Sequence, residues 1–427
     1  MGLVILLGTF ATCVVAGIPI AFALGVAALA TATYAGIPEL IVFQRIVAGI
    51  NVFSLLAIPF FIFAGEIMMR GGIALRLVRA AESLVGQVRG GLGVVNVLTS
   101  MLFGGISGSA VADTSALGSV MIPMMRERGY DDDYTVNVTV TSSIAGVLIP
   151  PSHNMILYAL AAGGGISITA LFIAGVVPGI LLCLCLSVAA YVVAAKRGYP
   201  TGIFPGWRAV IFAVGAAIPG FLTAVVIIGG VVSGIFTVTE SAAIGVIYAL
   251  AVTLLFYRSL TWAAFRDSVT QAIRTTAMVM ILVGTAQAFS YFVTLYQVPT
   301  IILESLQALT ENKILLLLLI NLSLLALGMI MDMGALILIC TPIFLPVAKA
   351  LGVDPVQFGM ILMMNLGLGL TTPPVGPCLF VGCAIAKVRI ESVVRTIWPF
   401  YLAIFAALML TTYVPAISLT LPRLLGY

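Results

Sequence analysis

The chain has 427 residues, of which 62% are hydrophobic and only 8% are charged, with a formal net charge of +4. Soluble domains carry about 25% charged residues, so this composition excludes a soluble protein and indicates a polypeptide that resides in lipid. No segment outside the apolar runs is long enough to form a separate domain. We therefore do not expect this chain to capture a scarce solute outside the membrane on its own.

The apolar runs define the predicted membrane spans. A spanning helix needs about 20 mainly apolar residues. The predicted spans, in chain order, are 3–35, 52–69, 134–163, 168–195, 209–233, 237–257, 275–294, 356–386 and 396–420. Residues 36–51 are too mixed to span. Residues 70–89, with four arginines among Leu, Val and Ala, predict an amphipathic helix in the membrane interface, and 295–313 predict a second such connector.

Two further apolar stretches are interrupted near their middles. Residues 90–125 contain the segment 104–110, with Ser107, Gly108 and Ser109 at its centre, and residues 314–347 contain the segment 328–334. Each half of these stretches is too short to cross a bilayer alone. The sequence therefore predicts two re-entrant helical hairpins whose tips lie at these interruptions.

Two of the predicted spans contain adjacent prolines, Pro150-Pro151 and Pro373-Pro374. Proline lacks the N–H that a helix needs and pushes the preceding residue out of the helical conformation. Irregular backbone at membrane depth is tolerated only where it is packed in protein or lines a wet cavity. Two interrupted spans at corresponding places indicate the ion and substrate site of a secondary transporter.

The two halves of the chain repeat. Asp113 matches Asp332 at an offset of 219 residues, and after a four-residue insertion Gly146 matches Gly369 at an offset of 223. The predicted division of the chain is 1–51 (N-terminal span and connector), 52–165 (first repeat), 166–270 (linking and scaffold spans), 271–388 (second repeat) and 389–427 (C-terminal span).

The distribution of Arg and Lys predicts the orientation of these spans. With the N-terminus in the cytoplasm and the C-terminus in the periplasm, 15 of the 19 basic residues fall in inner loops, as the positive-inside rule requires. The hairpins then enter from opposite sides. The predicted fold is an all-α polytopic membrane protein with inverted repeats, two re-entrant hairpins and two broken helices, which is typical of alternating-access transporters.

The hairpin tips and the proline breaks together predict cation sites. The first tip offers hydroxyls, and Gly146 to Pro151 offer unpaired carbonyl oxygens, which suit a hard cation such as sodium. The second half offers Gly328 and four residues of its break. These four residues are Gly369, Thr371, Thr372 and Pro374. We expect at least two ion sites, although small residues at the tips also fit close helix packing.

Polar residues near these features are candidates for cargo binding. Asp113 and Asp332 follow the tips, where a carboxylate marks either a transport path or a helix cap. Glu240, after two threonines, fits a cap. His153 and Asn154 follow the first break directly; a lone His is more often structural, whereas Asn154 offers hydrogen bonds to a polar solute. No Arg or Lys falls in the predicted core, so an anion would meet hydroxyls, helix N-termini and bound cations.

These motifs together resemble a known family. The Gly104–Ala110 tip, the Pro-Pro-Ser break, Phe236–Ala243 and the Leu370–Gly376 segment are similar to the large membrane subunit of tripartite ATP-independent periplasmic (TRAP) transporters. The resemblance covers essentially the whole chain. It implies an elevator-type secondary transporter of the ion-transporter superfamily in the bacterial inner membrane. It also implies sodium-driven import of organic acids such as C4-dicarboxylates or sialic acid.

The resemblance further implies partners and site residues. The partners are a small four-helix membrane subunit and a periplasmic substrate-binding protein; no cofactor is expected, and at least two sodium ions would serve as coupling ions. Four residues match positions that hold one sodium ion, namely Ser107, Gly146, Ile149 and Pro151. The residues expected at the second ion are Gly328, Gly369, Thr372 and Pro374, with Thr371 beside them. Apart from the resemblance, the position and chemistry of the polar side chains predict the residues that meet the substrate, which are Ser109, Asp113, His153, Asn154 and Asp332.

Two other functions compete with this one. A proton-coupled antiporter would use Asp113 and Asp332. An intramembrane serine hydrolase would use Ser107 or Ser109 as nucleophile with His153 as base, but it leaves the duplicated Pro-Pro span unexplained, and the second half has no histidine. We therefore predict a transporter rather than an enzyme.

Overall fold

A computed structural model describes residues 1–427, except for the side chain of Ile106. The described chain is helical, with one isolated bridge between Arg89 and Thr201. The helices of the first half are α1 (Gly2–Val15), α2 (Ile20–Ala35), α3 (Leu40–Ile50), α4 (Ala57–Arg70), α5 (Ile73–Val85), α6 (Gly91–Ser107), α7 (Ala110–Glu127), α8 (Asp132–Ser142), α9 (Ala145–Leu148), α10 (His153–Ala161) and α11 (Ile168–Lys196).

The remaining eleven helices lie between residues 207 and 424. They are α12 (Trp207–Val232), α13 (Val238–Ala251), α14 (Trp262–Leu295), α15 (Val298–Leu309), α16 (Lys313–Gly328), α17 (Met333–Ala350), α18 (Pro355–Gly369), α19 (Pro377–Ala386), α20 (Ile390–Val394), α21 (Trp398–Tyr413) and α22 (Pro415–Leu424). A 3₁₀ turn (Phe53–Leu56) precedes α4, and a π-helical turn (Val252–Phe256) extends α13. Six helices are long and apolar enough to cross a membrane, or up to eight if each bent pair is one span.

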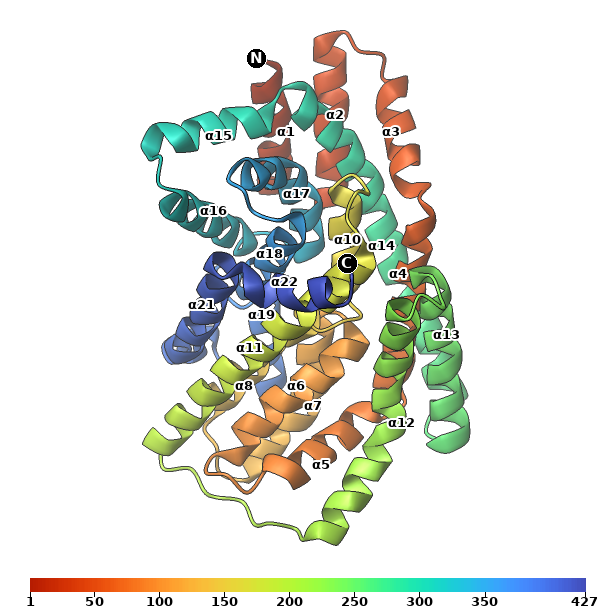
Figure 1. The fold of residues 1–427 in the computed structure, drawn as a ribbon, viewed down its shortest axis with the longest axis vertical. Helices are drawn as coiled ribbons and strands as arrows, with labels where there is room; N and C mark the ends of the chain where they lie inside the picture. The colour runs from red at the N-terminus through yellow and green to blue at the C-terminus, as the bar shows by residue number, and fades with distance from the viewer.

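Both predicted hairpins and the first broken span are confirmed. α6 packs against α7, and α16 against α17, as re-entrant pairs joined at the predicted tips. Asp132–Leu148 and His153–Ala161 are bent by 54° at the Pro-Pro segment. The predicted connectors also form: α5 buries Leu77 and Val78 while it exposes Arg79, and it lies along the lower edge in Figure 1, whereas α15 lies along the upper edge.

The prediction of one span over residues 3–35 was wrong. Gly17 has a φ of +80°, and Pro19 follows it, so the helix cannot continue. α1 and α2 instead form a hairpin in which the two helices pack against each other (Figure 1). The sequence missed this turn because both sides of it are equally apolar.

The hairpin moves the N-terminus to the opposite end of the molecule. Gly2 packs against the ring of Tyr296 at the C-terminal end of α14. At the other end of that 34-residue helix, Asp267 lies 3.9 Å from Arg70, and a helix of this length spans about 50 Å. The N-terminus therefore lies far from α5 and its arginines, which removes the basis for predicting a cytoplasmic N-terminus.

The last predicted span, 396–420, is also divided. α21 and α22 are bent by 61° at the segment Val414-Pro415, because proline cannot donate the helical hydrogen bond there. The Tyr413 hydroxyl donates to the carbonyl of Ile314 in the first turn of α16 (2.8 Å). The end of α21 therefore lies at the start of the second hairpin, whereas the C-terminal Tyr427 donates its hydroxyl to the Val232 carbonyl at the end of α12 (3.4 Å).

The helix boundaries and backbone conformations show how the residues of the two halves align. One offset of 223 residues relates the two halves, without the four-residue insertion inferred from the sequence. The pairs that define it are Ser109 and Asp332 as helix caps, Ala110 and Met333 as helix starts, Glu127 and Ala350 as helix ends, Gly129 and Gly352 at positive φ, and the cis bonds Pro150-Pro151 and Pro373-Pro374. The proposed equivalence of Asp113 and Asp332 was wrong by one helical turn. Pro123 of α7 does not distinguish the offsets of 219 and 223 residues, because α17 has a proline at each corresponding position, Pro342 and Pro346.

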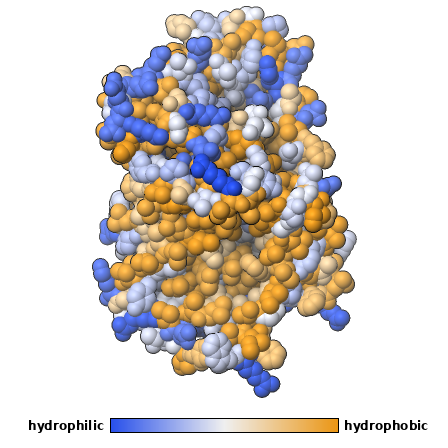
Figure 2. Space-filling model, in the orientation of Figure 1, coloured by the Kyte–Doolittle hydropathy of each residue, from blue (hydrophilic) through white to orange (hydrophobic). Residues whose placement is uncertain are grey.

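The outer surface agrees with a membrane location. Figure 2 shows a broad hydrophobic area across the middle and lower part of the molecule, with hydrophilic residues gathered above it and at the lower edge. The helices α12 and α13 contribute exposed apolar side chains such as Phe212, Ile218 and Ile247. Such side chains are stable where lipid or another membrane protein covers them.

Candidate functional site

The first hairpin tip is closed by a left-handed glycine and a helix cap. Gly108 has a φ of +62°, a conformation that glycine adopts without steric cost. Ser109 is the N-cap of α7, and its hydroxyl oxygen accepts a hydrogen bond from the Ala112 N–H (3.4 Å). Ser107, predicted as a sodium ligand, ends α6 beside it, with its hydroxyl 3.5 Å from the Ser109 carbonyl.

This tip packs directly on the first proline break. A Cβ on Gly104 would lie 2.5 Å from the Cα of Gly146, so the two backbones touch only because both residues are glycine. At the turn itself, Gly108 faces the Pro151 carbonyl, and its own carbonyl accepts from the Asn154 amide (3.3 Å). The structure thus brings the predicted tip and break residues of the first half together.

The break leaves carbonyl oxygens without helical donors. In a continuous helix, Pro150 and Pro151 would donate to the carbonyls of Gly146 and Val147, and proline has no N–H. Within the described part of the chain, no other backbone N–H reaches these two oxygens. Ile149, the remaining predicted ligand, is extended and packs its side chain against Gly179.

The second half repeats this contact with different hydrogen bonding. A Cβ on Gly369 would lie 2.5 Å from the Gly328 carbonyl carbon, so the second tip also meets its break through two glycines. The Val375 N–H donates to the Met329 carbonyl (3.1 Å), which ties the break to the hairpin. Pro374 is exposed beside it.

Both threonines of the second break use their hydroxyls locally. The hydroxyls of Thr371 and Thr372 each donate to the Leu368 carbonyl at 2.8 Å. Their lone pairs remain available as acceptors. The Thr371 carbonyl accepts from the Tyr401 hydroxyl (2.6 Å), so this oxygen already has a protein partner.

The two aspartates occupy different environments. Asp332 is an exposed N-cap, whose carboxylate accepts from the Gly334 N–H (2.9 Å); of the two roles considered for it, capping is realised. Asp113 lies one turn inside α7, fully buried, and neither carboxylate oxygen has a hydrogen-bond partner among the described residues. Glu240 forms the predicted capping box with Thr237.

A pocket of about 400 Å³ opens beside the first tip. Ser107, Ser109 and His153 line it from the hairpin and the start of α10. The opposite wall comes from α4 and α14. The polar residues of that wall are Glu66, Arg70, Gln271 and Thr275. Asn154 and Asp113 lie behind the tip rather than in this pocket, and Asp332 belongs to the other half.

None of the four polar residues of the opposite wall was assigned to the site from the sequence, although Glu66 stands out there as an acid in an otherwise apolar segment. Residues 271–275 read as part of an apolar span or its edge, and Arg70 was assigned to the interfacial connector. The structure extends α4 to Arg70 and starts α14 at Trp262, which turns these side chains toward the tip. Helix-period spacing of Asp267, Gln271 and Thr275 is the signal that could have indicated a common face.

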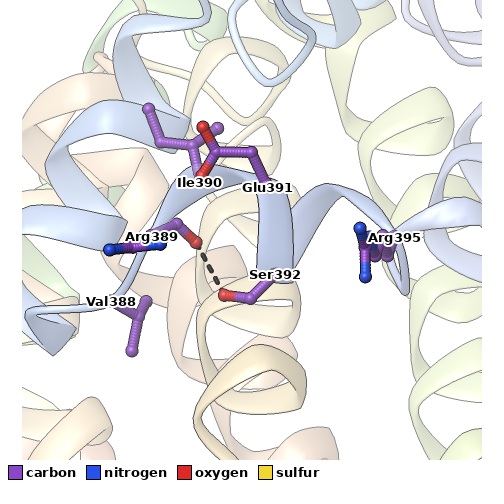
Figure 3. Close-up of a pocket in the computed structure, with 6 residues that line it drawn as sticks. All are labelled: Val388, Arg389, Ile390, Glu391, Ser392 and Arg395. Carbon is purple, nitrogen blue, oxygen red and sulfur yellow. Dashed lines mark hydrogen bonds between the residues drawn. The ribbon is translucent and has the colours of Figure 1, made fainter.

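A second cavity, of about 640 Å³, lies away from both tips (Figure 3). One short segment, residues 388–395, lines it, and the Ser392 hydroxyl donates to the Arg389 carbonyl (2.6 Å). Figure 3 shows the Arg389 and Arg395 side chains pointing in different directions. They form part of a basic end of the molecule rather than a converging site.

Comparison with known proteins places the chain in a family. The model of the family described as "Tripartite ATP-independent periplasmic transporter, DctM component" matches residues 7–417. An uncharacterized protein, YgiK, of Salmonella typhimurium is 43% identical over 99% of this chain and 97% of its own length. The sialic acid TRAP transporter large permease protein SiaM of Vibrio cholerae is 39% identical over 96% of both chains.

A solved structure shows the same fold at low sequence similarity. The YdaH transporter of Alcanivorax borkumensis superimposes with a TM-score of 0.63 over 90% of this chain and 89% of its own, at 14% identity. The inverted repeats, hairpins and broken helices thus occur in a known transporter fold. Together with the family match, they show that this chain is a multi-pass membrane permease of the DctM component family of tripartite ATP-independent periplasmic transporters, and not an enzyme.

Proposed function

We propose that this chain is the large transmembrane subunit of a sodium-coupled importer for a small organic acid. The observation that carries the proposal is the tip-on-break contact, which occurs in both halves and has a polar pocket beside it in the first half. Family membership supports the organic-acid cargo. The relative from Vibrio cholerae bears the name of a sialic acid transporter.

One sodium ion would bind where the first tip meets its break. The ligands would be the Ser107 hydroxyl and backbone oxygens of Gly146, Ile149 and Pro151. This assignment is supported by the lost helical donors at the prolines and by the preference of hard cations for oxygen. A second ion would bind at the corresponding place, among Gly328, Gly369, Thr371, Thr372 and Pro374.

Transport would proceed by an elevator movement. The two hairpins and broken helices would form the moving body, and α4, α12, α13 and α14 would belong to the scaffold. The pocket supports this division because its walls come from both sets of helices. Movement of the tip past α14 would therefore open one face of the cargo site and close the other.

The basic end of the molecule would face the cytoplasm. Arg70, Arg128 and Arg197 are all at the ends of helices that lead to this end, where they pair with Asp267, Glu82 and Asp133 respectively. By the positive-inside rule, the α1–α2 hairpin then leaves the N-terminus in the periplasm. The location would be the bacterial inner membrane.

Two partner proteins would complete the transporter. A small four-helix membrane subunit would cover apolar scaffold surface, and a periplasmic substrate-binding protein would deliver the acid. Exposed apolar side chains on α12 and α13 support the need for a membrane partner.

The test is uptake by liposomes that contain this chain together with a small subunit of the same transporter family, with the loaded binding protein added outside. An inward sodium gradient should drive uptake of labelled acid, and replacement of sodium by choline should abolish it. Uptake that ignores the sodium gradient would refute the coupling.

Proton coupling is the second candidate, and one observation favours it. The fully buried carboxyl of Asp113 lacks a protein partner in the described chain, and such groups in membranes often carry protons. Asp332 gives no matching support because it is an exposed cap. Uptake driven by a pH gradient in sodium-free buffer, and lost in Asp113→Asn, would establish this alternative.

A further inference from the structure

We infer that the cargo is a hydroxylated monocarboxylate of the sugar-acid type rather than a dicarboxylate. The inference rests on the proposed function and concerns the pocket between the first tip and α14. Its basis is the balance between one cationic group and several uncharged hydrogen-bonding groups in the pocket wall.

The charges that line the pocket favour a single carboxylate. Arg70 is the only Arg or Lys among the described lining residues. Its guanidinium lies 3.4 Å from the Glu66 carboxylate and 3.9 Å from that of Asp267. One cargo carboxylate could share this cation, as bidentate pairing with Arg allows. A second carboxylate would find no second Arg or Lys in the described lining and would face Glu66.

The uncharged groups favour hydroxyls on the cargo. Ser115 lines the hairpin side, and Gln271 and Thr275 line the scaffold side. None of these three side chains is hydrogen-bonded in the part of the chain that the structure describes. When an occluded pocket holds a bare hydrocarbon, polar groups of this kind remain unpaired and cost binding energy, whereas a polyol satisfies them.

The geometry of α14 orders these groups along one line. Asp267, Gln271 and Thr275 are spaced by four residues and therefore share one face of the helix. Arg70 sits at the Asp267 end of this face. A sugar acid could place its carboxylate at Arg70 and extend its hydroxyl-bearing carbons past Gln271 toward Thr275 and Ser109.

The experiment measures thermal unfolding of the complete chain, purified in detergent with sodium, in the presence of defined probes. Gluconate and glucuronate represent sugar acids, succinate a dicarboxylate, hexanoate an unhydroxylated acid, and glucose a neutral polyol. We expect the sugar acids to raise the melting temperature at concentrations at least tenfold below those that succinate, hexanoate or glucose require.

Two variants test whether the α14 face is responsible. The double variant Gln271→Leu with Thr275→Val should weaken the response to gluconate at least tenfold and leave the response to hexanoate unchanged. The matched control is Thr276→Val, because Thr276 lies on another face of α14, in an apolar recess beside Phe60 and Phe63. This control should respond to gluconate as the unmodified chain does.

The outcomes separate this inference from the proposed function. A stronger response to succinate than to sugar acids, no response to any sugar acid, or an unchanged gluconate response in the double variant would overturn the inference. Sodium-driven uptake of succinate alone would keep the proposed function and overturn the inference. If gluconate raises the melting temperature as expected but its uptake into liposomes proceeds equally well without a sodium gradient, the inference would stand and the sodium coupling would be overturned.

Discussion

The two tip-and-break units share one register but differ in how their backbone oxygens are satisfied. In the second unit the carbonyls of Gly369, Leu370 and Thr371 accept from the Thr372 N–H, the Cys378 N–H and the Tyr401 hydroxyl. In the first unit the carbonyls of Gly146 and Val147 receive no backbone donor within the described chain. The same pair of prolines therefore has different consequences in the two halves.

This difference suggests that the two units depend on a bound cation for their stability to different extents. Unpaired buried carbonyls are costly unless a ligand supplies a partner. The first unit, which also borders the cargo pocket, should depend more strongly on a bound cation for its stability. The second unit is largely satisfied by protein donors, so it should be ordered before an ion arrives.

The glycine contacts provide the largest test of this comparison. Alanine at Gly104 or Gly369 would place a Cβ 2.5 Å from backbone atoms, whereas alanine at Gly146 or Gly328 would meet its nearest atom at 3.3 or 3.2 Å. Backbone cannot rotate away, so overpacking by Gly104→Ala or Gly369→Ala should cost about 3 kcal/mol. Gly146→Ala and Gly328→Ala should each cost about 1 kcal/mol.

Thermal unfolding in detergent, with transport in liposomes, would measure these costs. Gly215→Ala is the control, because a Cβ there meets nothing within 4 Å, and it should leave both readouts unchanged. Equal losses of stability in all four glycine variants would contradict the different clearances that the structure shows at these positions.

The aspartates give the next effect, and its sign differs between the halves. Asp113→Asn replaces a buried, unpaired carboxylate by a neutral amide and so removes the cost of burying a charge, which in sodium-free buffer should raise the free energy of unfolding by about 1–3 kcal/mol. Asp332→Ala removes a helix cap and should lower it by about 1 kcal/mol. Denaturant titration would measure both, and a loss of stability in Asp113→Asn would indicate that its carboxylate has a partner in the folded protein.

The smallest effect concerns the single hydroxyl that closes the second break. Tyr401→Phe removes the donor to the Thr371 carbonyl and should cost about 0.5–1.5 kcal/mol. It should also make the second unit resemble the first, so added sodium should restore part of the lost stability. Isothermal sodium titration of the variant against the unmodified chain would detect this, and Tyr413→Phe, at the far end of α21, is the control that should show no sodium-dependent rescue.

Much of the fold followed from residue order alone. Proline pairs interrupt a helix wherever they occur, arginines cannot stay in the bilayer core, and apolar length sets whether a helix crosses. The hairpins, the first broken span, both connectors and the Glu240 cap therefore agree with the sequence-based predictions. The α1–α2 turn was not foreseen because Gly17 and Pro19 sit within a run whose apolar character is uniform.

The remaining features depend on contacts between distant parts of the chain. Asp113 and Ser109 look like comparable polar residues in sequence, and only the packing of α7 against its neighbours makes one a buried carboxylate and the other a cap. Likewise, Arg70 and Gln271 are 201 positions apart and meet in one pocket because α4 packs along α14. Local chemistry sets where a helix begins and breaks, whereas the partner of each polar atom is set by which helix faces it.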